Sequence, residues 1–130
     1  MRVGVDLLSI ERFNRISDHP RAARIVFTDG ELEYAGTLGL QRRREFLAGR
    51  FCAKEATAKL LGRGYGQGLR WRDIEVTRDE WGAPSIRLSG GADRIARRAG
   101  LRHIEISISH HVELVICAAV GIDDDRKAQP

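Results

Sequence analysis

The first residues of the chain alternate in the way typical of a β-strand. Val3, Val5 and Leu7 are each separated by one residue, and this period of two places their side chains on one face of a strand. Asp6 falls between them. Its carboxylate is therefore predicted to lie on the face opposite the valines.

Three short helices are predicted after this strand. Apolar residues at positions 10, 13 and 16 recur at helical spacing and form one stripe. Pro20 is placed to open a second helix, because proline fits the first helical position. Thr28 and Glu31 have the spacing of a capping box, which predicts the start of a third helix.

The strongest helical pattern runs from about Arg42 to Leu61, and Gly62 follows as its stop. Apolar side chains cover most of the circumference of this helix, so we expect it at the centre of the fold. Its charged residues must then bind partners other than water, because burial of an unpaired charge is costly.

The second half of the chain begins with a glycine-rich loop, Gly62–Gly68. The loop follows a helix and lacks the Lys-Ser/Thr ending of a phosphate-binding loop, so we expect it mainly to connect elements. Beyond it, the patterns predict strands around 74–76 and 86–88, a helix over 92–99, and strands over 104–109 and 112–120. Residues 123–130 are almost all polar and are predicted to form a disordered tail after a single domain over residues 1–122.

Composition narrows the class of protein. The 130 residues are enough for one domain, and a net charge of +4 favours anionic partners without choosing among them. No apolar stretch approaches the roughly 20 residues that span a bilayer, and the N-terminus lacks the layout of a signal peptide. Cys52 and Cys117 have no metal-ligand spacing, so we expect two reduced thiols in a cytoplasmic protein.

Several residues could carry chemistry, and each has an ordinary structural explanation. Taken by itself, Asp6 would be interpreted as a helix cap or a salt-bridge partner. Glu55 and Lys59 have the i, i+4 spacing of a helix ion pair, although a buried pair would be a poor stabiliser. Taken together with His110, these carboxylates and the lysine suit magnesium-assisted phosphoryl transfer, because Mg²⁺ is held by one or two carboxylates and substrate phosphates.

A series of motifs, in order along the chain, resembles the acyl-carrier-protein synthase family of 4′-phosphopantetheinyl transferases. The segment 46–59, FLAGRFCAKEATAK, is similar to the family's signature helix almost letter for letter. The other motifs are 4–12 (GVDLLSIER), Phe27-Thr28-x-x-Glu31, Asp73-Ile74-Glu75-Val76, Gly82-x-Pro84 and Ser107-Ile108-Ser109-His110. The resemblance extends over roughly residues 3–121.

This resemblance implies an α+β fold in which a small antiparallel sheet packs on a long central helix. It also implies a homotrimer that binds coenzyme A in clefts between subunits. The expected reaction transfers 4′-phosphopantetheine from coenzyme A to a serine of an acidic apo acyl carrier protein and releases 3′,5′-ADP. Whether the carrier serves fatty-acid, polyketide or peptide synthesis stays open, as does the group that accepts the serine proton.

The resemblance also implies roles for particular residues. Asp6 and Glu55 would bind Mg²⁺ with the coenzyme A pyrophosphate, and Lys59 would contact the phosphates as a candidate acid for the leaving group. The expected coenzyme A contacts are Arg50, Arg43 or Arg44 of a neighbouring subunit, Lys59, Ser109 and His110. Arg12, Arg15, Arg21 and Arg24 lie in the basic segment 10–24 that resembles the surface docking acidic carrier proteins.

Two other functions compete with this reading. The run Arg42-Arg43-Arg44 would suit a nucleic-acid-binding domain, but the chain has no recognition motif and no aromatic stacking set on a strand. A non-catalytic relative kept as an interaction module is the second alternative. The presence of Asp6, Glu55, Lys59 and His110 argues against it.

Overall fold

A computed structural model describes residues 1–123 of the chain. The elements in chain order are β1 (Arg2–Ser9), α1 (Ile10–Ser17), α2 (Pro20–Val26), α3 (Asp29–Ala35), α4 (Leu40–Leu61), the 3₁₀ helix η1 (Trp71–Asp73), β2 (Ile74–Arg78), β3 (Pro84–Leu88), α5 (Gly90–Arg98), β4 (Leu101–His111) and β5 (Leu114–Asp123). The predicted tail lies outside these residues, apart from Asp123, which ends β5.

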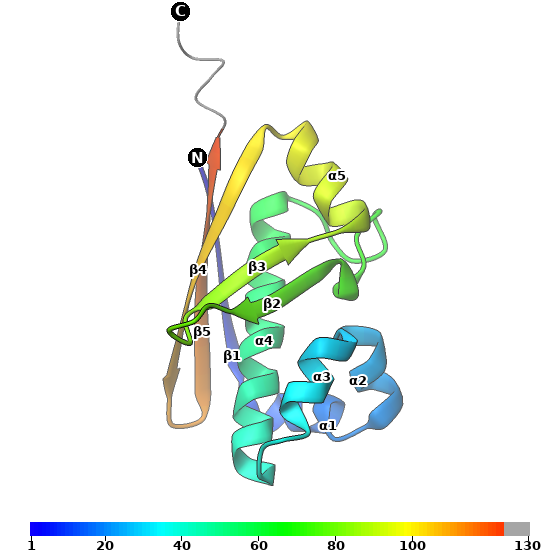
Figure 1. Ribbon diagram of the computed structural model, residues 1–130, viewed down its shortest axis with the longest axis vertical. Helices are drawn as coiled ribbons and strands as arrows, with labels where there is room; N and C mark the ends of the chain where they lie inside the picture. Colours follow the sequence, from blue (N-terminus) through cyan, green and yellow to red (C-terminus); the bar gives the residue numbers. More distant parts are fainter. Residues whose placement is uncertain (124–130) are drawn as a thin grey trace, which may run out of the picture.

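Two antiparallel sheets pack on the long helix α4. One sheet has the strand order β1-β5-β4, and the other consists of β2 and β3. Figure 1 shows α4 running along the three-stranded sheet, with α1, α2 and α3 gathered beside one half of the helix and α5 near its other end. The α+β architecture predicted for the chain is confirmed, with two sheets in place of one.

Local capping starts the three short helices where the sequence places them. Thr28 and Glu31 form a complete capping box at α3, and the His19 side chain accepts from the backbone of α2. In α1 the expected apolar stripe is wrong in its last member. Ile16 is 39% exposed, whereas Ser17 is buried, because positions 10, 13 and 17 have the i, i+3, i+7 spacing of one helix face and position 16 falls outside it.

Helix α4 is central, as predicted, and begins two residues earlier, at Leu40. Gly62 ends it in the left-handed conformation, with φ of 72°. Strand β1 comes very close to this helix at Gly4, where a Cβ atom would lie 2.0 Å from the carbonyl oxygen of Ala56. Only glycine fits there, and the neighbouring Asp6 is held against α4 as a result.

The C-terminal hairpin differs from the prediction at its turn. Val112 was expected to begin the last strand, but it lies in the turn with φ of 52°, and β5 begins at Leu114. A β-branched residue is rarely found in this left-handed region. Strand β4 is correspondingly longer and reaches His111.

Strand pairing fixes which side chains face α4. Asp6 is paired with Cys117, and Cys117 with Ile108, across the three strands. Cys117 is buried, so this row of side chains, including Asp6, lies on the inner face. Val3, Val5 and Leu7 lie on the outer face and are 47–61% exposed, which confirms the predicted orientation of β1.

Candidate active site

Asp6 and Lys59 meet where β1 crosses α4. The Lys59 ammonium lies 3.0 Å from the Asp6 carboxylate oxygen Oδ1 and also donates to the carbonyl of Val5 at 3.1 Å. The sequence spacing suggested an ion pair between Glu55 and Lys59, whereas the lysine bonds to Asp6 in the structure. Residues 53 positions apart are thus joined in one cluster.

Glu55 completes this cluster from α4. Burial raises the pKa of the Glu55 carboxyl, the negative charge of Asp6 raises it further, and the positive charge of Lys59 opposes this effect. The pKa of Lys59 is raised, chiefly by its hydrogen bond to Asp6, so its ammonium keeps its charge. Two carboxylates and one cation therefore share a half-buried site in which further positive charge would be stabilising.

Cys52 holds Asp6 from the buried side of α4. Its thiol donates to the Asp6 carbonyl at 3.3 Å and lies 3.6 Å from the carboxylate oxygen Oδ2. Burial, followed by the charge of Asp6, raises the pKa of this thiol. Cys52 therefore stays protonated and acts as a donor that holds the Asp6 backbone against α4, a role that the sequence did not indicate.

The chemistry of Asp6 and Glu55 fits Mg²⁺, which prefers oxygen ligands and usually takes only one or two carboxylates from the protein. In the described part of the chain no group of three or more histidine, cysteine, aspartate and glutamate side chains could hold a metal ion. A cation here would thus depend on oxygens from a substrate and from water to complete its coordination.

His110 lies on the same inner face of the sheet as Asp6, on β4, with β5 between the two strands. Its Nε2 atom is 3.4 Å from the Glu45 carbonyl oxygen, and a Cβ atom on Gly49 would lie 3.4 Å from it. Ser109 lies on the opposite, outer face, paired with Ile116. One subunit therefore brings His110 to α4 on the inner face and leaves Ser109 on the other side of the sheet.

Arg50 lines a separate cavity of about 240 Å³ on another side of α4. It is only 9% exposed, its Nε atom has no hydrogen-bond partner within the described residues, and its guanidinium lies over the Phe46 ring at 4.2 Å. Burial lowers the pKa of Arg50, and the charge of Arg78 adds to this effect. A buried arginine with an unused donor suits an anionic ligand.

Arg78 and Tyr34 belong to this cavity and were missed in the sequence. The Arg78 guanidinium stacks on the Tyr34 ring at 3.9 Å, which places a second cation beside Arg50. These residues come from α3 and from the end of β2, and no spacing in the sequence indicates that they meet. Together with Phe46 they form a basic cavity with aromatic walls.

Arg43 and Arg44 stand apart from the Arg50 cavity. Arg44 forms a two-bond ion pair with Asp18, with distances of 2.6 and 3.3 Å. The hydrogen bond from Arg44 lowers the pKa of Asp18. Within one subunit, Arg44 thus fastens the end of α1 to α4, and neither arginine lies among the residues that line the Arg50 cavity.

The four arginines expected to bind a carrier protein are all exposed. Arg12 and Arg15 project from α1, and Arg21 and Arg24 from α2. None of the four has an ion-pair partner among residues 1–123. The surface of these two helices therefore carries uncompensated positive charge.

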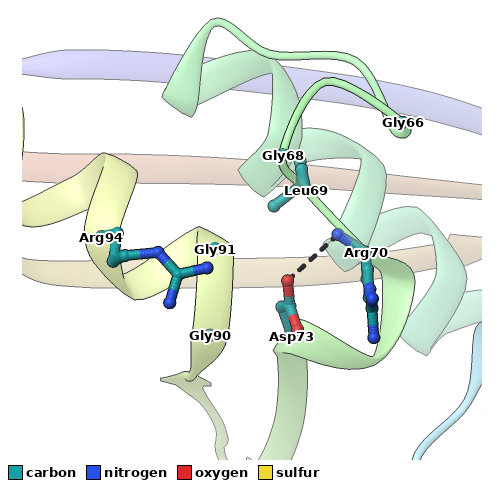
Figure 2. Close-up of a pocket in the computed structure, with 8 residues that line it drawn as sticks. All are labelled: Gly66, Gly68, Leu69, Arg70, Asp73, Gly90, Gly91 and Arg94. Atoms are coloured by element: carbon teal, nitrogen blue, oxygen red, sulfur yellow. Dashed lines mark hydrogen bonds between the residues drawn. The ribbon is translucent and has the colours of Figure 1, made fainter.

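A further cavity, of about 440 Å³, lies between the segment 66–70 and the start of α5 (Figure 2). Arg94 and Arg70 lie on either side of Asp73, which accepts a hydrogen bond from the Arg70 backbone at 3.1 Å. None of the predicted site residues lines this cavity, so it stands outside the candidate site.

No described helix is both long and apolar enough to cross a membrane.

Known proteins resemble this chain in sequence and in fold. Residues 2–119 match the 4′-phosphopantetheinyl transferase superfamily. A holo-[acyl-carrier-protein] synthase of Clostridium novyi (strain NT) is 40% identical over 119 residues, which are 91% of this chain and 84% of that protein.

Solved structures extend the likeness to three dimensions. A holo-(acyl-carrier-protein) synthase from Bacillus anthracis str. Ames, in complex with CoA (3′,5′-ADP), superposes with a TM-score of 0.80 at 30% identity and covers 95% of this chain and 96% of its own. An acyl carrier protein synthase from Plasmodium yoelii with ADP bound gives a TM-score of 0.84 at 28% identity, with 95% of each chain covered.

Proposed function

Because this chain belongs to the 4′-phosphopantetheinyl transferase superfamily, we infer that it is a holo-[acyl-carrier-protein] synthase. It transfers 4′-phosphopantetheine from coenzyme A to a serine of an apo acyl carrier protein and releases 3′,5′-ADP. The observation that carries this conclusion is the meeting of Asp6, Glu55 and Lys59 where β1 crosses α4. The substrates are inferred from the related proteins, and the cluster of Asp6, Glu55 and Lys59 supports phosphoryl transfer as the reaction.

Asp6 and Glu55 would hold Mg²⁺ together with the pyrophosphate of coenzyme A. When bound, the metal offsets the charge of the pyrophosphate and orients it for attack. The serine oxygen of the carrier forms a bond to the β-phosphorus as its proton passes to a carboxylate or a water of the site, and the bond from that phosphorus to the bridging oxygen of 3′,5′-ADP breaks. Lys59 stays charged through its bond to Asp6, so it stabilises the negative charge that develops on the leaving phosphate.

The adenosine end of coenzyme A would bind at Arg50. Arg50 lines the cavity beside α3 and β2, whereas Lys59 bonds to Asp6 of β1 and is not among the residues that line this cavity. A site shared between subunits would bring the Arg50 of one subunit toward the Asp6 cluster of another, and Arg43 or Arg44 of a neighbouring subunit would contact the same ligand. His110 lies near α4 on the inner face and would contact the phosphates, while Ser109 would belong to the shared boundary.

A homotrimer would provide such shared sites. The outer face of the three-stranded sheet exposes apolar residues on two neighbouring strands, namely Val3, Val5, Leu7, Leu114 and Ile116. Contiguous apolar surface of this kind is typical of an interface. Asp6 belongs to the same strand but faces inward, so an interface on this outer face would share β1 with the catalytic cluster.

The exposed arginines of α1 and α2 would dock the carrier. Within residues 1–123, Arg12, Arg15, Arg21 and Arg24 have no ion-pair partner, and acyl carrier proteins are acidic. Exposed charge pairs each contribute about 0.2–1 kcal/mol and act mainly on the rate of encounter. The docking surface and the coenzyme A site are therefore separable by mutation.

Mass spectrometry of an apo carrier protein incubated with coenzyme A and Mg²⁺ tests the function directly. The wild type should add one phosphopantetheine mass. Glu55→Gln should nearly abolish the transfer, because it removes one of the two carboxylates available to the metal, while Glu80→Gln on the exposed β2–β3 turn should leave it unchanged. If Glu55→Gln keeps the wild-type turnover at limiting Mg²⁺, Glu55 is not a ligand of the metal.

A further inference from the structure

The cavity between the segment 66–70 and the start of α5 contains two arginines that the candidate active site does not use (Figure 2). Its volume of about 440 Å³ lies within the range of roughly 300–1,000 Å³ that is usual for small-molecule sites. The sequence indicated only a connecting role for the glycine-rich loop that forms part of one wall. The lining residues are Gly66, Gly68, Leu69, Arg70, Asp73, Gly90, Gly91 and Arg94.

Backbone contacts hold the two walls of this cavity together. A Cβ atom on Gly91 would lie 1.7 Å from the carbonyl oxygen of Gly68, so the two backbones are in contact and only glycine fits. The Ser89 backbone N–H donates to the carbonyl of Asp73 at 2.9 Å, and Leu69 is buried. The walls are therefore fixed relative to each other, which lowers the cost of ordering them around a ligand.

Arg70 and Arg94 give the cavity an excess of positive charge. Neither guanidinium forms an ion pair among residues 1–123, although Asp73 lies between the two side chains (Figure 2). A single exposed arginine is usually just solvated. Two unpaired guanidiniums on opposite walls of one cavity instead suit a phosphate monoester, which carries a charge of about −1.5 to −2 at pH 7 and accepts from both.

Asp73 adds a hydrogen-bond acceptor to this basic cavity. Its Oδ2 atom accepts from the Arg70 backbone N–H at 3.1 Å, and its Oδ1 atom has no hydrogen-bond partner among residues 1–123. A Cβ atom on Gly90 would lie 2.8 Å from Oδ1, so glycine at this position leaves the oxygen uncovered. A carboxylate oxygen accepts from hydroxyl groups and repels a second anionic group. The matching ligand therefore has one phosphate and at least one hydroxyl group.

We propose that this cavity binds the phosphate monoester of a small hydroxylated molecule, such as a sugar phosphate. The phosphate lies between the guanidiniums of Arg70 and Arg94, and a hydroxyl group of the ligand donates to Asp73. This binding site is additional to the transferase function inferred above and does not depend on it.

Coenzyme A is the other source of this chemistry, because its ribose carries a phosphate monoester. The position of the cavity argues against it. None of the residues assigned to coenzyme A or to the metal, namely Asp6, Glu55, Lys59 and Arg50, lines the cavity. A probe that lacks the adenine and the pyrophosphate separates the two sources, and ribose 5-phosphate is such a probe.

Isothermal titration calorimetry of the full-length protein with ribose 5-phosphate tests the site. We expect one saturable site per chain, and saturating coenzyme A should not displace the probe. Ribose and inorganic phosphate should each bind about tenfold more weakly or less, since each offers only part of the contacts. Arg94→Gln should weaken binding of ribose 5-phosphate by about tenfold or more, because it removes a charged hydrogen-bond donor.

Arg98→Gln is the matched control. It removes the same charge one turn further along α5, at a residue that does not line the cavity, so binding of ribose 5-phosphate should be unchanged. Arg94 and Arg98 are both exposed, and neither substitution should unfold the protein.

Each other result contradicts the proposal in a distinguishable way. Absence of saturable binding shows that the cavity is not a site, and equal losses in Arg94→Gln and Arg98→Gln show only a general attraction of anions to α5. Displacement by coenzyme A assigns the probe to the coenzyme A site. Equal affinity for inorganic phosphate contradicts the role of Asp73. A wild type that binds ribose 5-phosphate but transfers no phosphopantetheine overturns the transferase function alone.

Discussion

Replacing Glu31 by glutamine should destabilise the fold by about 3–5 kcal/mol, because it removes the carboxylate that pairs directly with the buried ammonium of Lys54. Lys54 lies in the middle of α4, and its Nζ atom is 2.8 Å from the Glu31 carboxylate; both side chains are almost fully buried. The ammonium also donates to the carbonyls of Trp71 and Ile74. Burial lowers the pKa of Lys54, and the charge of Glu31 opposes this effect.

The geometry sets the size of the effect. Glu31 accepts backbone hydrogen bonds from Thr28 and Val76, at 2.9 and 3.0 Å, in addition to its bond with Lys54. Glutamine has one acceptor oxygen in place of two, so it cannot serve all three donors and brings an amide donor into the same space. The double variant Glu31→Gln with Lys54→Met buries no charge, so it should be less destabilised than the sum of the two single variants.

Urea unfolding followed by tryptophan fluorescence measures this effect, because the Trp71 carbonyl binds Lys54 directly. All variants must be compared at one protein concentration, since an oligomer's stability depends on it. Asp29→Asn is the matched control. It is an acid-to-amide change in the same helix, and its ion pair with Arg72 is exposed, so it should cost no more than about 1 kcal/mol. A loss below about 1 kcal/mol for Glu31→Gln would refute the reasoning.

Three further predictions concern activity and assembly. The acidic limb of the kcat/KM profile should move to lower pH as Mg²⁺ is raised, because the metal competes with the proton for Glu55, whose pKa is raised by burial; a limb that does not respond to Mg²⁺ would contradict this. Leu7→Glu, on the exposed face of β1, should yield monomers by light scattering, since the proposed interface would bury an unpaired charge; intact trimers would place the interface elsewhere. Arg12→Glu with Arg15→Glu should raise the carrier KM strongly, leave coenzyme A binding unchanged and weaken the salt dependence; loss of coenzyme A affinity instead would assign these arginines to the cofactor site.

Periodicity and capping were sufficient to predict most elements and the direction of Asp6. Val3, Asp6 and the long helix could be placed because side-chain period alone determines which residues share a face. The expected stripe of α1 failed at Ile16, and the last strand began late at Leu114, because both depend on how an element meets its neighbours. Periodicity carries no information on that contact.

The partners of the charged residues were the least predictable part of the site. Lys59 lies four residues from Glu55, yet it bonds to Asp6, and Arg44 bonds to Asp18 across 26 residues. Which residues form these ion pairs depends on which elements come close in the tertiary structure and not on spacing along one helix. The same holds for Arg78, which reaches the Arg50 cavity only because β2 crosses α4.

The close approach of β1 to α4 links these observations. At Gly4 the strand backbone lies so close to α4 that no side chain fits between them, since a Cβ atom would lie 2.0 Å from the Ala56 carbonyl oxygen and 2.8 Å from the Leu60 backbone nitrogen. At this short separation Asp6 contacts two residues of α4. Its backbone carbonyl accepts a hydrogen bond from the Cys52 thiol, and its carboxylate accepts one from the Lys59 ammonium. A wider gap would place a carboxylate on the sheet and an ammonium on the helix without contact. The absence of a side chain at one residue of β1 is thus a physical condition for the charge cluster two residues later.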